Sequence, residues 1–421
     1  MEKTSSIRPR IVITGVGVIA SNGIGKEVFR EAIRCGVSGI KPVTAFDTSA
    51  IETHIAGQVL DFEPELYIDK KEIRRMERFT QMAVAASKMA ILDAKLNLDE
   101  EDLELCGVVL GTGMGSFDRT EKECRTLISQ GIGRVSPSYM ATSIPNAAAA
   151  QVSISNGFKG YLGTTLASCA AGIQSVGESY FHMQRGLAEI MLAGASEASI
   201  SPLCFGSFSN LKALSTLNEN PQGAARPFSL DRDGFVMSEG AGIVVLETLS
   251  HALARNAFIY AEIVGFGACS DAFHITSPDP DGDGMRRAME LALKDGDISK
   301  SSIDYINAHG SGTKMNDVLE TMAIKKVFGE RAYAIPVSST KSMTGHSLSS
   351  AGAIELIATV LAMNAGFIPP TINLNIPDPE LDLDYVPNQA RIKEIRTAML
   401  NSFGFGGQNA CLIVHSYPSN E

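Results

Sequence analysis

The sequence lacks two features that would direct the protein to nucleic acid or into a membrane. It has no long block of lysine and arginine, and its 421 residues carry a formal net charge of −11, which argues against general nucleic-acid binding. No uninterrupted run of about 18 apolar residues occurs, so no membrane span is expected. The apolar run 11–20 vaguely resembles a signal peptide, but its β-branched residues and glycines favour a first strand and turn.

Cysteines are few, and they follow no regular spacing. The seven cysteines are an odd number and form no C-x-x-C pair, so we expect free thiols in the reducing cytoplasm rather than a disulfide framework. No cluster has the spacing of metal ligands. Residues 279–290 match a calcium-loop pattern, but Arg286 stands where that loop needs an apolar residue, which favours an acidic loop that caps a helix. Gly111-Thr112-Gly113 lacks the spacing of a dinucleotide-binding turn. No metal is therefore expected.

Strand-like and helix-like segments alternate along the whole chain, which predicts an α/β fold with a mostly parallel sheet. The expected strands are 10–18, 107–112, 163–168, 189–194, 242–247, 259–268, 303–308, 335–339 and 409–415. The expected helices are 25–35, 78–95, 119–130, 145–156, 170–185, 284–295, 315–328 and 349–365. The same order of elements occurs twice, which predicts two related halves, residues 1–257 and 258–421.

Three residues at chain turns suggest covalent catalysis. Cys169 lies between a strand-like run and a helix start, and His309 and His346 follow strand-like runs and stand beside glycines. The positive end of a helix dipole favours the thiolate, which is a good nucleophile for thioesters. Two neutral imidazoles can donate hydrogen bonds to one carbonyl oxygen and stabilise an enolate. The alternative for each residue alone is structural, because a single cysteine is usually a small buried hydrophobic residue.

Four strings in order carry a resemblance to a known family. They are Ser168-Cys169-Ala170-Ala171-Gly172, Asn307-Ala308-His309-Gly310-Ser311-Gly312-Thr313, Ser339-Thr340-Lys341-Ser342-Met343-Thr344-Gly345-His346 and Asn401-Ser402-Phe403-Gly404-Phe405-Gly406-Gly407. Together they resemble the β-ketoacyl-acyl-carrier-protein synthases of the elongating type II class. The resemblance spans residues from about 10 to 415. It implies the thiolase fold, in which two similar α/β halves form a five-layered αβαβα sandwich, and usually a homodimer.

The resemblance also implies an activity. Members of this family transfer an acyl chain to a cysteine and condense it with malonyl-acyl carrier protein, with loss of CO₂. The expected product is a 3-oxoacyl-acyl carrier protein in fatty acid elongation. No cofactor is expected, because the substrates travel on the phosphopantetheine of acyl carrier protein.

Roles for individual residues follow from the same resemblance. Cys169 matches the acyl-accepting nucleophile, His309 and His346 the paired histidines, and Lys341 the lysine beside them, with Glu355 as its expected partner. Phe405 matches the gate residue, Met114 and Phe208 match the lining of the acyl pocket, and Thr313 matches a hydroxyl that contacts pantetheine. Basic positions for carrier-protein docking fall on Lys71, Arg74, Arg75, Arg134 and Lys212, although Val135 replaces one further basic residue.

Departures from the family pattern leave alternatives open. Gly312 separates Ser311 from Thr313, Lys314-Met315 replaces a small or proline-containing pair, and Gln408 replaces a threonine. A specialised polyketide or aryl-polyene ketosynthase with the same chemistry is therefore the nearest alternative. A non-catalytic thiolase-fold scaffold is an alternative of another class. A thiolase would need a second cysteine close to the C-terminal glycine turn, and Cys411 is too far from it.

Overall fold

Two five-stranded groups with the same strand order make up the central sheet of the computed structural model, which describes residues 8–418. The first group has the order β6-β5-β7-β8-β1, with β1 at Ile11–Ala20, β5 at Cys106–Gly111, β6 at Leu162–Thr165, β7 at Ile190–Glu197 and β8 at Gly240–Thr248. The second has the order β11-β10-β14-β15-β9, with β9 at Ala261–Ser270, β10 at Tyr305–Asn307, β11 at Val337–Ser338, β14 at Thr397–Gly404 and β15 at Gln408–His415. A short ladder between β1 and β9 joins the groups.

The two groups also share strand directions, and these correct the prediction of a mostly parallel sheet. β5 runs parallel to its neighbours β6 and β7. β8 runs antiparallel to its neighbours β7 and β1. The second group repeats this pattern. The antiparallel pairing of β14 and β15 follows from their three-residue connection, Phe405–Gly407, because a parallel pair needs a long crossover. β14 was missed in the sequence because Thr397–Gly404 lacks a β-branched run.

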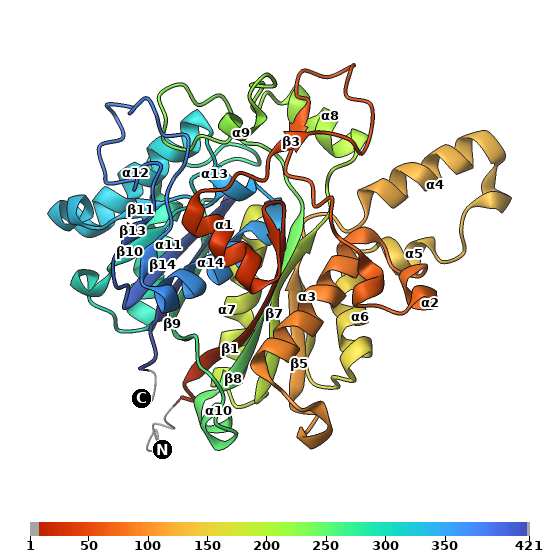
Figure 1. Ribbon diagram of the computed structural model, residues 1–421, viewed down its shortest axis with the longest axis horizontal. Helices are drawn as coiled ribbons and strands as arrows, with labels where there is room; N and C mark the ends of the chain where they lie inside the picture. Colours follow the sequence, from red (N-terminus) through yellow and green to blue (C-terminus); the bar gives the residue numbers. More distant parts are fainter. Residues whose placement is uncertain (1–7, 419–421) are drawn as a thin grey trace.

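Helices cover both faces of each group and create five layers (Figure 1). α7 (Ala171–Gln184) and α14 (Ala351–Ala365) lie between the two groups and share one apolar core with both. α3 (Arg78–Ala94) and α6 (Ala147–Asn156) cover the outer face of the first group, and α11 (Asp283–Asp295) and α12 (Lys314–Phe328) that of the second. The αβαβα order expected of the thiolase fold is therefore present. The division at residue 257 stays a prediction, because the β1–β9 ladder makes the sheet continuous.

One helical segment has the length and composition of a membrane span. Leu348–Ala365 is long and apolar enough to cross a membrane, with a mean hydropathy of 1.4, but 89% of it is buried inside the protein. Its position between the two sheet groups marks it as a core helix. The run 11–20 is likewise a fully buried strand, as its β-branched residues predicted.

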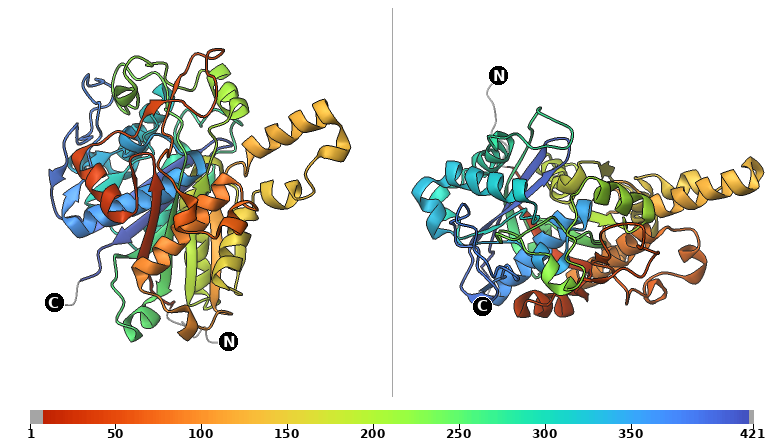
Figure 2. Two further views of the ribbon diagram at one scale, coloured as in Figure 1. Left: turned by 45° about the vertical axis from the view of Figure 1, so that its right-hand side comes forward. Right: turned by 90° about the horizontal axis from the view of Figure 1, so that it is seen from above.

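An arm extends from the body next to the first group. It consists of α4 (Phe117–Gln130) and α5 (Tyr139–Ser143), and it projects away from the sheet in all three views (Figures 1 and 2). The remaining short elements are α1 (Lys26–Cys35), α2 (Lys70–Ile73), α8 (Pro202–Asn210), α9 (Pro221–Ala224), α10 (Leu249–Ala254), α13 (Lys341–Thr344), β2 (Gly23–Ile24), β3 (Lys41–Pro42), β4 (Ile55–Ala56), β12 (Phe367–Ile368) and β13 (Arg391–Ile392).

Candidate active site

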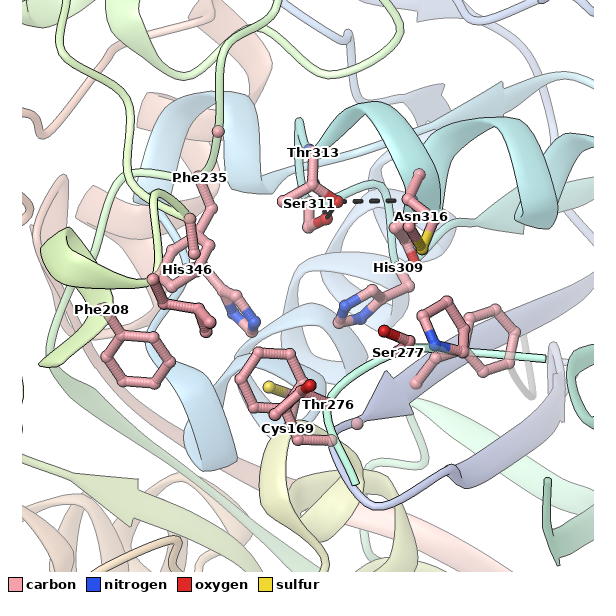
Figure 3. Close-up of a pocket in the computed structure, with 18 of the residues that line it drawn as sticks. Cys169, Phe208, Phe235, Thr276, Ser277, His309, Ser311, Thr313, Asn316 and His346 are labelled. Atoms are coloured by element: carbon pink, nitrogen blue, oxygen red, sulfur yellow. Dashed lines mark hydrogen bonds between the residues drawn. The ribbon is translucent and has the colours of Figure 1, made fainter. Parts of the chain in front are cut away.

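The equivalent ends of the two halves place Cys169, His309 and His346 around one cavity of about 420 Å³. Cys169 stands between β6 and α7, and His309 follows β10. His346 follows the short helix α13 rather than a strand directly. Figure 3 shows the Cys169 sulfur facing the two imidazoles, whose ring centroids are 5.3 Å apart at an angle of 83°. Residues that are far apart in the sequence thus form one cluster.

The turn that carries Cys169 is strained and tightly packed. Ser168, the residue before the cysteine, has a φ of +49°, which is unfavourable for a residue with a Cβ. The Ser402 hydroxyl donates a hydrogen bond of 2.9 Å to the Cys169 carbonyl oxygen. A Cβ at Gly404 would lie 2.9 Å from the Cys169 nitrogen, so glycine is required there. The hairpin of β14 and β15 therefore holds the cysteine turn in place.

The electrostatics of Cys169 differ from the prediction of a thiolate favoured by a helix dipole. Burial raises the pKa of the Cys169 thiol to about 11, although Lys341 favours ionisation. The buried carboxyl of Glu197 raises the pKa further, while the backbone N–H groups of Cys169 and Phe405 lower it. Loss of hydration outweighs the favourable charge and dipoles, so the resting residue is a neutral thiol.

Alkylation of Cys169 by iodoacetamide is therefore expected to accelerate about tenfold per pH unit from about pH 7 to pH 9, because only the thiolate reacts. Peptide mass spectrometry separates this site from the exposed residues Cys35 and Cys124, and the Cys169→Ala variant supplies the background. A rate that reaches a plateau below pH 8 would show that the resting cysteine is a thiolate.

Both histidines are held neutral. Burial lowers the pKa of His309 well below its ordinary value, and the nearby Lys341 ammonium and His346 lower it further. Burial and Lys341 lower the pKa of His346 in the same way. A neutral imidazole has one N–H donor. The Lys341 ammonium lies 3.5 Å from Nδ1 of His309, which makes Nδ1 the acceptor and leaves the proton on Nε2.

A buried ion pair stands behind His309. The Lys341 ammonium donates to the His309 carbonyl oxygen at 2.7 Å and pairs with the Glu355 carboxylate. The structure thus brings together the lysine and the glutamate that the resemblance paired. Burial raises the pKa of Glu355 to about 7, and Lys341 opposes this effect. The ion pair fixes the backbone and the tautomer of His309.

Several supporting residues were not identified in the sequence. The Glu320 carboxylate accepts hydrogen bonds from the backbone N–H groups of His309 and Gly310, at 2.9 and 2.8 Å, and from the Asn401 amide. The Phe235 ring packs edge-on against His346 at 5.2 Å. The available sequence signal for Glu320 was a glutamate within the helical segment that follows the histidine–glycine turn.

Of the predicted acyl-pocket and gate residues, two line the cavity and one does not. Phe208 and Phe405 both line the cavity, and their ring centroids are 6.1 Å apart. Met114 does not line it: the methionine belongs to an apolar cluster that includes Cys169 and Phe208, and its sulfur lies 3.7 Å from that of Cys204.

Two of the remaining predicted residues line the cavity and four do not. Thr313 lines the cavity and caps α12. Lys212 also lines it, but its ammonium pairs with Glu52 at 2.6 Å. The other four residues predicted to dock the carrier protein are all exposed: Lys71, Arg74, Arg75 and Arg134. No group of three or more histidine, cysteine, aspartate or glutamate residues within 8–418 could hold a metal ion.

Two family models and several known proteins match this chain over most of its length. Residues 8–252 match the N-terminal domain of the β-ketoacyl synthases, and residues 260–375 match the C-terminal domain. The 3-oxoacyl-[acyl-carrier-protein] synthase 2 of Synechocystis is 46% identical over 97% of this chain and 99% of its own length. The protein of the same name from Staphylococcus aureus is also 46% identical, over 97% of this chain and 98% of its own.

Solved structures share the fold over nearly the whole chain. A β-ketoacyl synthase from Burkholderia phymatum has a TM-score of 0.91 at 35% identity and covers 97% of this chain and all of its own. A ketosynthase in complex with a type II polyketide synthase acyl-carrier protein has a TM-score of 0.89 at 38% identity, with 97% and 100% covered. These relatives confirm the predicted thiolase fold, and the chain belongs to the β-ketoacyl synthase family.

Proposed function

We propose that the protein is a 3-oxoacyl-acyl-carrier-protein synthase, which extends acyl chains by decarboxylative Claisen condensation with malonyl-acyl carrier protein in fatty acid elongation. The observation that carries this proposal is the cavity in which one thiol faces two neutral imidazoles. The relatives of the same name support it. This chemistry needs neither a redox cofactor nor a metal, because both substrates arrive as thioesters on the phosphopantetheine of acyl carrier protein.

In the first half-reaction, the Cys169 sulfur attacks the thioester carbonyl of an acyl-carrier protein. The backbone N–H groups of Cys169 and Phe405 both act on the sulfur position and can stabilise the developing oxyanion. The tetrahedral intermediate then expels the pantetheine thiolate, which takes up the proton that leaves the Cys169 thiol. The acyl chain remains on the cysteine, and the first carrier departs.

In the second half-reaction, malonyl-carrier protein occupies the cavity that the first carrier has left. Nε2–H of His309 and the imidazole of His346 donate to the thioester oxygen, and the malonyl group loses CO₂ to form an enolate. The enolate carbon attacks the acyl-Cys169 carbonyl and expels the Cys169 thiolate. That thiolate takes a proton from solvent, and the 3-oxoacyl chain leaves on its carrier, two carbons longer.

The chain-binding and gating residues are part of the same proposal. Phe208 and Met114 would contact the acyl chain, and Phe405 would move to admit it. Gly406 and Gly407, which follow Phe405, have φ values of +80° and +67° and hydrogen-bond to the loop 271–275. The Phe405 side chain is 37% exposed, so a rotation would not have to break a buried core.

Carrier proteins are acidic, and this protein is acidic as well, so their association requires a local basic patch. Arg74 and Arg75 follow α2 and are exposed, although Arg75 also pairs with Glu72 at 3.4 Å. The double substitution Arg74→Glu and Arg75→Glu is expected to raise KM for acyl- and malonyl-carrier protein by about tenfold, because two contacts become repulsive. Steady-state kinetics at two salt concentrations measures the effect.

The control for this prediction is a small pantetheine thioester, whose turnover should change little because the cavity is untouched. The effect on the carrier protein should also shrink as salt rises, since exposed charges are screened beyond about 10 Å at 0.1 M. An equal loss with both substrates would mean that the patch has a structural role only.

We also propose that the protein is a cytoplasmic homodimer. β6 is the edge strand of the first sheet group. Its Leu162 is 49% exposed, and the adjacent Tyr161 and Leu166 are 49% and 54% exposed. An exposed apolar edge strand tends to pair with another chain, and a second copy of this protein would cover it.

A polyketide ketosynthase is a second candidate, because a type II polyketide ketosynthase is among the structural relatives at 38% identity. The two functions differ in the acyl group that Cys169 accepts from the carrier. A fatty acid synthase is expected to accept saturated acyl groups and to reject unreduced 3-oxoacyl groups. Rapid loading of 3-oxoacyl chains would favour the polyketide function.

A further inference from the structure

The entrance of the catalytic cavity contains charged side chains that differ in how they are balanced. The charged residues other than histidine and cysteine that line the cavity are Lys212, Asp233, Asp271 and Lys314. The Lys212 ammonium pairs with the Glu52 carboxylate at 2.6 Å. The Asp233 carboxylate pairs with the Arg226 guanidinium at 3.0 Å. These two charges are therefore neutralised by neighbours within the chain.

Lys314 differs from the other three charged residues of the cavity lining because its side chain has no partner among the described residues. The Asp271 carboxylate accepts a hydrogen bond of 2.7 Å from the Asn409 amide. Lys314 is exposed, and no carboxylate lies within 4.0 Å of its ammonium in residues 8–418. The cavity lining thus holds a positive charge with no ion-pair partner, on a lysine that departs from the family pattern, and one carboxylate, Asp271, whose side-chain partner is an amide.

The backbone that carries Lys314 is fixed by a buried arginine. The Arg232 guanidinium donates to the Lys314 and Thr313 carbonyl oxygens at 3.1 and 3.4 Å. Arg232 is only 3% exposed, and it pairs with Asp378 at 2.7 Å and with Asp317 at 3.4 Å. The stem of Lys314 therefore starts from a rigid point, and binding an anion would order only its side chain.

We infer that the Lys314 ammonium binds the phosphate of the phosphopantetheine arm while the thioester of that arm lies at Cys169. The inference rests on the proposed function, in which every substrate reaches Cys169 on such an arm. The thioester and the phosphate stand at opposite ends of the arm, so a thioester at the bottom of the cavity leaves the phosphate near its entrance. Thr313, the predicted pantetheine contact, is the neighbour of Lys314. An ammonium is a compact charge that suits a phosphate oxygen.

Three thioesters of one acyl group separate the phosphate from other partners: acyl-pantetheine, acyl-phosphopantetheine and acyl-carrier protein. The rate of Cys169 acylation by each is measured by intact-protein mass spectrometry for the wild type and for Lys314→Met. The variant is expected to lose about five- to tenfold in kcat/KM with the two phosphate-bearing substrates, the size of an exposed charge-assisted contact. With acyl-pantetheine the loss should be less than about twofold.

Lys326→Met is the matched control, because Lys326 is an exposed lysine of the same helix that does not line the cavity. A loss with acyl-carrier protein alone would mean that Lys314 contacts the carrier surface, and this would overturn the inference. Equal losses with all three substrates, or no loss, would overturn it as well. If the wild type transfers acyl groups from none of the three, the proposed function itself fails.

Discussion

Replacement of either cavity histidine by alanine should lower the decarboxylation of malonyl-carrier protein by about a hundredfold or more. His309 and His346 are both buried and neutral, and each can donate one hydrogen bond to the enolate oxygen. Removal of one donor leaves the developing charge with a single hydrogen bond from the histidine pair. Release of CO₂ from malonyl-carrier protein, measured without an acyl substrate, isolates this step.

Two further variants make the result specific. Cys169→Ala should keep measurable decarboxylation and lose condensation, because the cysteine accepts the acyl chain and does not hold the enolate. His415→Ala should behave as the wild type, since His415 is an exposed residue at the end of β15. Normal decarboxylation by both cavity variants would show that the histidine roles are wrong, whereas a wild type that does not decarboxylate malonyl-carrier protein would favour a non-catalytic scaffold.

The substitution Lys341→Met is expected to destabilise the protein by about 3–5 kcal/mol near neutral pH, because it leaves the Glu355 carboxylate buried without its partner. The pKa of Glu355 is already raised from 4.5 to about 7 in the folded protein, and loss of the lysine raises it further. A carboxyl whose pKa rises on folding loses stability as the pH rises through the interval between the two values. The penalty should therefore be larger at pH 8 than at pH 5.5, as measured by urea unfolding.

The double variant Lys341→Met with Glu355→Gln provides the control. A glutamine cannot ionise, so the additional pH dependence should disappear, and part of the stability should return. A Lys341→Met variant whose free energy of unfolding does not change between pH 5.5 and pH 8 would show that Glu355 has the same charge in the folded and the unfolded protein, so that folding does not raise its pKa.

The parts of the fold that were predictable are those with a local signal. β7 is buried along its whole length and begins with a continuous apolar run, and α14 is mostly apolar because it lies between two sheet groups. The duplicated order of elements predicted two similar halves. β14 had no such signal, because its strand conformation depends on pairing with β10 and β15 rather than on its own residues.

The sequence predicted which residues form the site, but it did not predict the charge state of Cys169. Short strings around Cys169, His309 and His346 indicated which residues would meet, since glycine turns at equivalent ends of two halves face one cavity. The charge state of Cys169 depends on burial and on Glu197, which comes from a different strand. Such a carboxyl cannot be identified from the sequence of the turn itself, and the place of Met114 in a cluster with Phe208 depends on how that whole cluster packs.

The central claim is that Cys169 alone carries the acyl chain between the two half-reactions. The most direct test is incubation with acyl-carrier protein in the absence of malonyl-carrier protein, followed by peptide mass spectrometry of all seven cysteines. One acyl group per chain is expected, on Cys169, and it should disappear when malonyl-carrier protein is added and 3-oxoacyl-carrier protein forms. An adduct found mainly on Cys106, Cys204 or Cys269, or an adduct on Cys169 that malonyl-carrier protein cannot remove, would contradict the account.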